Sequence, residues 1–107
     1  GVIAAFFPDT LFLKKTMLVE KDEIHPEQAF VELYAEIRRE ETDCLQELEF
    51  HGPYRTLQPG ETMRHEETWE LHEYEGPGSP QAHTEFLRQL GLGPPANSRP
   101  NDAAVVP

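Results

Sequence analysis

The clearest pattern of hydrophobic and polar residues lies in the second half of the chain. Residues 63–72 (MRHEETWELH) alternate with a period of two. The odd face consists of Met63, His65, Glu67, Trp69 and Leu71, and it carries the larger apolar residues. This period predicts a long, half-buried β-strand. We expect the odd face to point toward the core, with Trp69 as a core residue.

A second strand is predicted just before it, at residues 45–51 (LQELEFH). Its odd face carries Leu45, Glu47, Glu49 and His51, and its even face carries Gln46, Leu48 and Phe50. Three ionisable side chains therefore lie on one surface, because alternate residues of a strand point to the same side. A bend at Gly52-Pro53 and a turn at residues 58–61 (QPGE) follow. Pro59 presets φ for the first central position of a type II turn, and Gly60 supplies the positive φ of the next.

The first half of the chain is predicted to be β with one ambiguous segment. Residues 1–7 (GVIAAFF) and 11–19 (LFLKKTMLV) form two apolar runs on either side of a Pro-Asp-Thr turn, and residues 20–26 form a charged loop. Residues 27–41 are rich in strong helix formers, and Phe30, Leu33 and Ile37 fall at helical spacing. In strand phase, Val31, Leu33 and Ala35 share a face equally well.

We expect one helix in the C-terminal part of the chain, because residues typical of helix termini stand at both of its ends. Ser79 is a good N-cap, Pro80 suits the first helical position, and Gly91 ends the segment. The helix is thus predicted at residues 80–90. Residues 92–107 contain several prolines and no apolar period, which predicts a disordered tail.

Composition and charge exclude some classes of partner. The chain has 20 acidic and 9 basic residues in 107, with a formal charge of −11. Such a surface repels the phosphates of nucleic acid and an anionic membrane, so we expect neither as a partner. Carboxylates hydrogen-bond sugar hydroxyls well, although a solvated acidic surface also serves solubility alone. The lone Cys44 rules out an internal disulfide and is expected to be buried and inert.

Three motifs in order carry a resemblance to a known family. LEFHGP at residues 48–53, TLxPGE at 56–61 and HxExWxL at 65–71 resemble the C-terminal end of galactose mutarotase-like proteins, the aldose 1-epimerase superfamily. The match is closest to the uncharacterised branches of that superfamily and extends more weakly to residues 30–34 (FVELY).

The resemblance implies a fold and a domain organisation. We expect a mainly β chain, an antiparallel β-sandwich that forms the last part of a larger supersandwich and ends in one α-helix. Residues 1–91 would form this β portion, with the helix at 79–91 and the tail after it. The resemblance also favours a strand at 29–36 over the helix, with a charged loop at 37–43.

The resemblance further implies a site. In mutarotase-like proteins the glutamate of a C-terminal Leu-Glu motif is the general base that takes a proton from the anomeric hydroxyl, and Glu49 matches that position. Glu47 shares its face and is the alternative, and His51 is placed to bind a substrate hydroxyl. The acid histidines of the superfamily lie upstream, and no other histidine of this chain matches them: His25, His65, His72 and His83.

We expect no metal site and no cofactor. The sequence after the Pro59-Gly60 turn is faintly similar to the first metal motif of cupins, but that motif needs His-x-His and here Glu67 stands at the second position. His65 and Glu67 share a strand face, so a carboxylate–imidazole pair is sterically possible. Phosphate-binding and dinucleotide-binding glycine motifs are missing from the sequence.

Three functions are therefore open. The first is a carbohydrate-associated protein that binds a sugar or interconverts its anomers, with a sugar as its ligand. The second is a non-catalytic β-sandwich interaction module, and the third is a cupin-like metal-binding protein. We also expect the chain to associate with the remainder of its own domain or with itself, because its sheet edges need partners.

Overall fold

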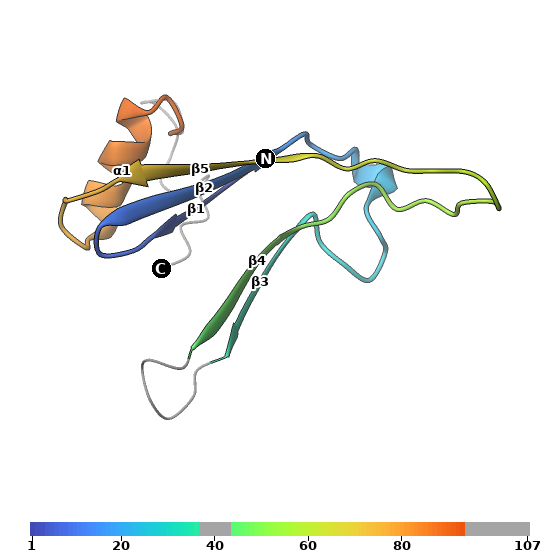
Figure 1. Cartoon of the computed structure of the whole chain (residues 1–107), viewed down its shortest axis with the longest axis horizontal. Helices are drawn as coiled ribbons and strands as arrows, with labels where there is room; N and C mark the ends of the chain where they lie inside the picture. Colours follow the sequence, from blue (N-terminus) through green and yellow to red (C-terminus); the bar gives the residue numbers. More distant parts are fainter. Residues whose placement is uncertain (37–43, 94–107) are drawn as a thin grey trace. The chain divides into compact units, whose positions relative to one another are not determined.

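The chain forms two β-sheets and, within the residues that the structure describes, one α-helix. The computed structural model describes residues 1–36 and 44–93. The elements in chain order are β1 (Val2–Phe6), β2 (Thr10–Thr16), the 3-10 turn η1 (Lys21–Glu23), β3 (Val31–Glu36), β4 (Leu45–Phe50), β5 (Glu67–Glu73) and α1 (Pro80–Gln89) (Figure 1). One sheet has the order β1-β2-β5 and the other pairs β3 with β4. The predicted class, mainly β with antiparallel sheets and one C-terminal helix, is confirmed.

Two compact units divide the chain, and each is described by itself. The first contains Gly1–Ile3 and Leu13–Trp69, and the second contains Ala4–Phe12 and the chain from Glu70 onward. The first unit therefore contains the whole β3–β4 hairpin and the long connection from β4 to β5. The second unit contains α1.

The second unit is built on the turn between β1 and β2 and on α1. Phe7 N donates to Thr10 O at 2.8 Å across this turn, and Tyr74 N donates to Asp9 O at 3.0 Å. Tyr74 is 4% exposed, and its ring lies edge-on to Phe86 of α1 at 5.1 Å between centroids. Aromatic edge-to-face packing of this kind fixes the helix on its part of the sheet.

The helix has the ends that its sequence predicts. Ser79 Oγ accepts from Ala82 N at 3.2 Å, Pro80 is the first helical residue, and Gly91 has φ of +74°. Because only glycine adopts positive φ without strain, Gly91 lets Leu92 N donate back to Leu87 O at 2.8 Å and close the last turn. The helix is confirmed and ends one residue earlier than expected. No helix among residues 1–36 and 44–93 has the length and apolarity needed to span a membrane. Of the predicted tail, residues 94–107 lie outside the described residues.

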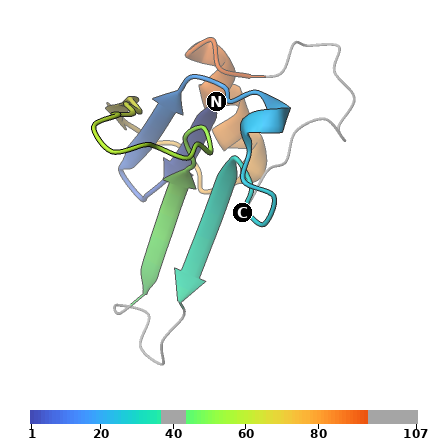
Figure 2. The same ribbon diagram turned by 90° about the vertical axis from the view of Figure 1, so that its right-hand side faces the viewer.

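The first unit shows that β3 is a strand despite its helical composition. β3 pairs antiparallel with β4, from Val31 opposite Phe50 to Glu36 opposite Leu45 (Figure 2). The pairing supplies hydrogen bonds and cross-strand contacts that outweigh the weak helical preference of single residues. The predicted strand at 29–36 is thus confirmed. The charged loop predicted at 37–43 lies outside the described residues.

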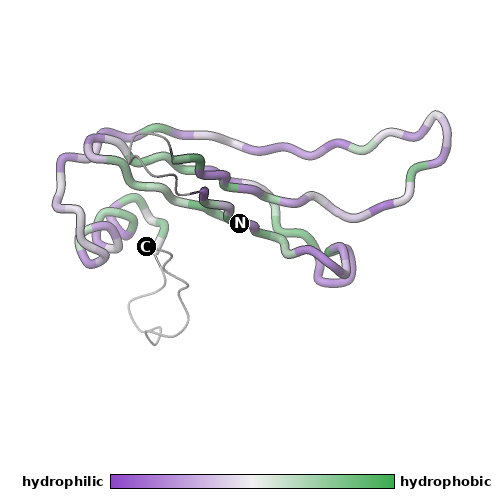
Figure 3. Tube along the Cα trace, turned by 90° about the horizontal axis from the view of Figure 1, so that it is seen from below, coloured by the Kyte–Doolittle hydropathy of each residue, from purple (hydrophilic) through white to green (hydrophobic). Residues whose placement is uncertain are grey.

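The core is concentrated on β2. Leu11 and Leu13 are fully buried, and Ile3 of β1 is 8% exposed. Figure 3 shows β1 as hydrophobic, whereas the turn η1 is hydrophilic. In the first unit Thr16 N donates to Gly1 O at 3.0 Å, which ties the start of β1 to the end of β2. Cys44, which we expected to be buried, is exposed just before β4.

The strand predicted at 63–72 is shorter and faces differently than expected. The turn before it is confirmed, because Glu61 N donates to Gln58 O at 3.0 Å and Gly60 has φ of +91°. β5, however, starts only at Glu67. Just before it, Thr16 Oγ1 donates to Glu66 O at 2.8 Å.

The odd face of β5 is not the buried face. Trp69 is 67% exposed and Leu71 is 74% exposed, so the prediction that Trp69 is a core residue was wrong. Its ring instead lies beside the charged group of Lys14, whose Nζ is 5.7 Å from the ring centroid. Alternation located the strand, but it did not identify which face of the sheet is covered.

Candidate functional site

The β3–β4 hairpin gathers ionisable side chains on one face, which we call the acidic face. In an antiparallel pair, residues opposite each other point to the same side of the sheet. The register places Glu49 opposite Glu32, Glu47 opposite Tyr34 and Leu45 opposite Glu36. The acidic face therefore consists of Glu32, Tyr34 and Glu36 from β3 and Leu45, Glu47 and Glu49 from β4.

Three of the side chains at one end of the hairpin converge, and we call Glu32, Glu49 and His51 the hairpin cluster. His51 Nε2 lies 3.5 Å from Glu32 Oε2 and 3.5 Å from Glu49 Oε2. One ligand atom from each of the three residues lies within 4.8 Å of the other two. The His51 Nε2 atom is buried and has no hydrogen-bond partner among the described residues.

The backbone holds the cluster in place. His51 follows β4, and its N–H donates to Phe30 O at 3.0 Å, which continues the pairing one step past the two strands. Ala29 N donates to Glu32 Oε1 at 3.2 Å, so the other oxygen of that carboxylate is the one near His51. Each of these hydrogen bonds fixes the position of one residue of the cluster.

The predicted site residues are therefore brought together only in part. Glu49 and His51 are neighbours, as the shared strand face predicts, and both are half-buried. Glu47 lies on the same face but outside the cluster, opposite Tyr34. Their chemical roles stay predictions.

Sequence reasoning missed two residues of this face, Glu32 and Tyr34. Glu32 enters the cluster through its pairing with Glu49, and Tyr34 presents an aromatic ring that is 51% exposed. The signal that could have found them is the register of the hairpin. Tyr34 and Glu32 alternate with Val31, Leu33 and Ala35, so their face follows once β3 is read as a strand.

His65 and Glu67 are the second pair that could bind a metal. Glu67 has further partners besides His65. Lys14 Nζ lies 3.1 Å from Glu67 Oε2, and Trp69 Nε1 donates to the same oxygen at 3.1 Å. His65 Nε2 is 3.6 Å from Glu67 Oε1. The carboxylate thus compensates the charge of a lysine, and this use competes with metal ligation.

Lys14 is the buried cation of the first unit. It is 9% exposed, its Nζ donates to Leu48 O at 2.8 Å, and the charge lies 5.9 Å from the Phe50 ring centroid. Together with Glu67 and Trp69, it links β2 with β4 and β5. A buried ammonium needs such a set of partners, because an unpaired one loses its solvation without compensation.

The ion pair between Lys14 and Glu67 makes the stability of the fold depend on pH. Burial alone raises the pKa of the Glu67 carboxyl, but hydrogen bonds from Trp69 and Lys14 and the charge of Lys14 outweigh burial and hold the pKa below its usual range. A lowered pKa in the folded protein stabilises the fold above the usual carboxyl pKa, and this stabilisation is lost as the pH falls through the lowered value.

We expect the free energy of unfolding to fall as the pH drops below about 4.3, the usual glutamate pKa, and Glu67→Gln to flatten this acid limb. Denaturant unfolding at a series of pH values measures the free energy of unfolding of both proteins. Glu66→Gln is the matched control, because that neighbouring carboxylate is exposed and pairs with the exposed Arg64. Identical pH profiles for the two variants would contradict the role of Glu67.

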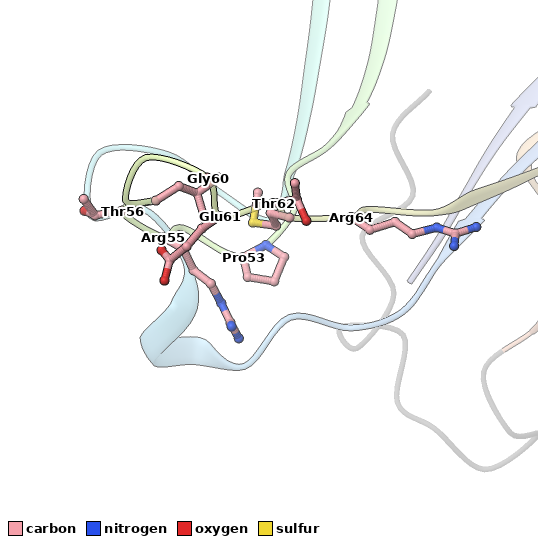
Figure 4. Close-up of a pocket in the computed structure, with 9 residues that line it drawn as sticks. Pro53, Arg55, Thr56, Gly60, Glu61, Thr62 and Arg64 are labelled. Carbon is pink, nitrogen blue, oxygen red and sulfur yellow. The ribbon is translucent and has the colours of Figure 1, made fainter.

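A hollow lies in the long connection between β4 and β5. Its lining includes Pro53, Gly60 and Glu61 and two arginines, Arg55 and Arg64 (Figure 4). Figure 4 shows the Arg64 side chain extending away from the other labelled residues. Arg55 pairs with Glu23 and Arg64 with Glu66, so both cations already have carboxylate partners. The hollow does not concentrate charge for a ligand, and the hairpin cluster is the stronger candidate.

Comparison with known proteins identifies a family. A family model described as "Domain of unknown function (DUF4380)" matches residues 1–72. Neither a curated protein nor a solved structure matches the chain. The matched region contains the whole hairpin cluster and Lys14, and it ends within β5, before α1. Because it covers 72 of the 107 residues, the chain belongs to the DUF4380 family.

Proposed function

We propose that this chain belongs to a carbohydrate-associated protein that binds a sugar on the acidic face and interconverts its anomers, with Glu49 as the general base. The observation that carries the proposal is the convergence of Glu49 with Glu32 and His51 beside an exposed tyrosine. Sugar sites combine polar groups that accept and donate hydrogen bonds with an aromatic ring that covers the apolar face of the pyranose.

The proposed chemistry needs one base on this chain. Glu49 takes the proton of the anomeric hydroxyl while an acid protonates the ring oxygen, so that the bond between C1 and the ring oxygen breaks and the open-chain aldehyde forms. Rotation about the C1–C2 bond and closure by the reverse steps give the other anomer. The resemblance implies that the acid is a histidine from outside this chain.

The other members of the acidic face would bind and position the sugar. Glu32, whose side chain is 39% exposed, would accept hydrogen bonds from hydroxyls, and Tyr34 would offer its ring. Glu47 lies farther along the face and would contact a more distant hydroxyl. The acidic surface suits a neutral polyol, because a carboxylate bonded to a hydroxyl accepts a charge-assisted hydrogen bond.

Sugar binding is tested by NMR titration with a panel of aldoses. We expect the backbone amides of Glu32, Tyr34, Glu49 and His51 to shift, and amides of α1 to stay unchanged and serve as the internal control. The protein should be expressed from its full reading frame, because the proposed acid is supplied from outside the chain. Absence of shifts with every aldose and with oligosaccharides would reject the sugar function.

A second candidate, a non-catalytic interaction module, is favoured by a different observation. Large apolar side chains of the first unit are exposed after β2 and on β5: Met17 at 85%, Leu18 at 74% and Trp69 at 67%. Exposed apolar residues of this size are typical of surfaces that contact another protein segment. The partner would be the remainder of the same domain or a second copy. The third candidate, a cupin-like metal site, is weakened by the contact of Glu67 with Lys14.

A further inference from the structure

The hairpin cluster has the donor set of a metal centre. It combines one imidazole nitrogen with two carboxylate oxygens, the ligands that zinc and manganese accept from proteins. In a tetrahedral site with metal–ligand bonds of about 2.1 Å, the ligand atoms lie about 3.4 Å apart. The two distances from His51 Nε2 to the glutamate oxygens, each 3.5 Å, are close to that separation.

His51 supplies the observation that distinguishes this cluster from an ordinary group of surface acids. Its Nε2 atom is buried against two carboxylate oxygens and has no hydrogen-bond partner in the described part of the chain. A buried polar atom without a partner is costly, so a missing ligand is one physical explanation for it.

The charge of the cluster and a backbone hydrogen bond to Glu32 also favour a divalent cation. The two carboxylates of the cluster carry two negative charges, which one divalent cation neutralises. The formal charge of −11 further raises the local concentration of cations. The hydrogen bond from Ala29 N to Glu32 Oε1 holds that carboxylate with its other oxygen toward the centre, as outer partners of metal ligands do.

We propose that Glu32, Glu49 and His51 bind one divalent transition-metal ion of the zinc and manganese type. Mg²⁺ and Ca²⁺ prefer all-oxygen sites, and the imidazole selects against them. Three protein ligands leave at least one coordination position for water or another ligand. The expectation of no metal site was based on motifs along the chain, whereas this site is completed by a residue from the paired strand.

This proposal does not rest on the proposed sugar function. A metal ion on Glu49 uses the lone pair that a general base needs, so the two roles compete for one carboxylate. Metal binding at the cluster would therefore inhibit anomer interconversion rather than support it. The two proposals are separated by their measurements, because metal binding is measured without sugar and anomer exchange is measured on protein freed of metal by a chelator.

The test measures binding of Zn²⁺ and, separately, Mn²⁺ to the full-length protein by calorimetry and by metal analysis after dialysis. We expect one Zn²⁺ per chain, with affinity lowered at least tenfold by Glu32→Gln and by His51→Ala. Glu47→Gln and His65→Ala are the matched controls and should bind as the unmodified protein does. A histidine-selective ¹H–¹⁵N NMR spectrum of the unmodified protein should show Zn²⁺ shifting the Nε2 signal of His51, a result that does not depend on the folding of any variant.

Four results would overturn the proposal, and the first three concern Zn²⁺ alone. These are the absence of saturable binding at one ion per chain, Zn²⁺ binding that leaves the His51 Nε2 signal in place, and binding that is lost in His65→Ala but kept in His51→Ala. Mg²⁺ at the same concentration should not displace Zn²⁺, and displacement would likewise contradict a site that uses an imidazole.

Discussion

Changing Glu49 to Gln should slow anomer interconversion by roughly 10²–10⁴-fold, the usual effect of losing a general base. Glutamine keeps the shape of the side chain and its hydrogen-bonding oxygen, but it cannot take up a proton from the anomeric hydroxyl. Sugar affinity should therefore stay within about tenfold, or about 1.4 kcal/mol. Exchange spectroscopy of the two anomers gives the rate, and an NMR titration gives the affinity.

Glu47→Gln is the matched control for this experiment. Glu47 lies on the same strand and the same face, two residues away, and differs from Glu49 in lying opposite Tyr34 instead of Glu32. It should reduce the rate far less. If Glu47→Gln gave the larger loss, the base would be Glu47 and the Leu-Glu motif would have been assigned to the wrong position. If both variants kept the full rate, neither carboxylate would be the base.

Changing Lys14 to Met should lower the free energy of unfolding by about 3 kcal/mol, more than a hundredfold in the unfolding equilibrium. Methionine fills the space of the lysine stem but leaves Glu67 half-buried without its cation and Leu48 O without its donor. Breaking a buried ion pair by removing one partner costs about 3–5 kcal/mol, and the slight exposure of both side chains places this pair at the lower end. Denaturant unfolding measures the effect.

A double variant separates the ion pair from the packing of the lysine stem. When Lys14→Met is combined with Glu67→Leu, neither charge of the pair remains, so part of the lost stability should return. The double-mutant cycle built from the two single variants and the double variant gives the coupling free energy between the two residues. Lys21→Met, at an exposed lysine of η1, is the control for loss of a positive charge from an acidic chain. Equal destabilisation by Lys14→Met and Lys21→Met would show that net charge, and not the buried contact, is responsible.

The hairpin shows how far the sequence predicts this fold and site. Alternation along residues 45–51 placed Glu49 and His51 on one face, and the structure brings them together. Strand pairing is a non-local interaction, so the partner of Glu49 could not be read from the sequence of β4 alone. Glu32 was in a segment of helical composition, and its role became visible only with the register of β3 against β4.

The β5 strand shows what could not be predicted from the sequence. The period of two correctly indicated a strand, and the size of Trp69 indicated a core position. Burial depends on which face is covered by other elements, and the described residues leave Trp69 and Leu71 exposed. Lys14 was an unremarkable charge within an apolar run of the sequence, yet it is buried because Glu67, 53 residues later, lies beside it. Contacts between residues far apart in the sequence thus determine both the exposure of Trp69 and the burial of Lys14.

We propose that the unmodified protein accelerates the exchange of sugar anomers through Glu49. The most direct measurement is the exchange rate between α and β anomers of a broad panel of aldoses, by NMR, with and without the full-length protein freed of metal by a chelator. We expect at least one aldose to exchange faster than in buffer alone and the acceleration to disappear in Glu49→Gln. Exchange at the buffer rate for every aldose would contradict the proposal.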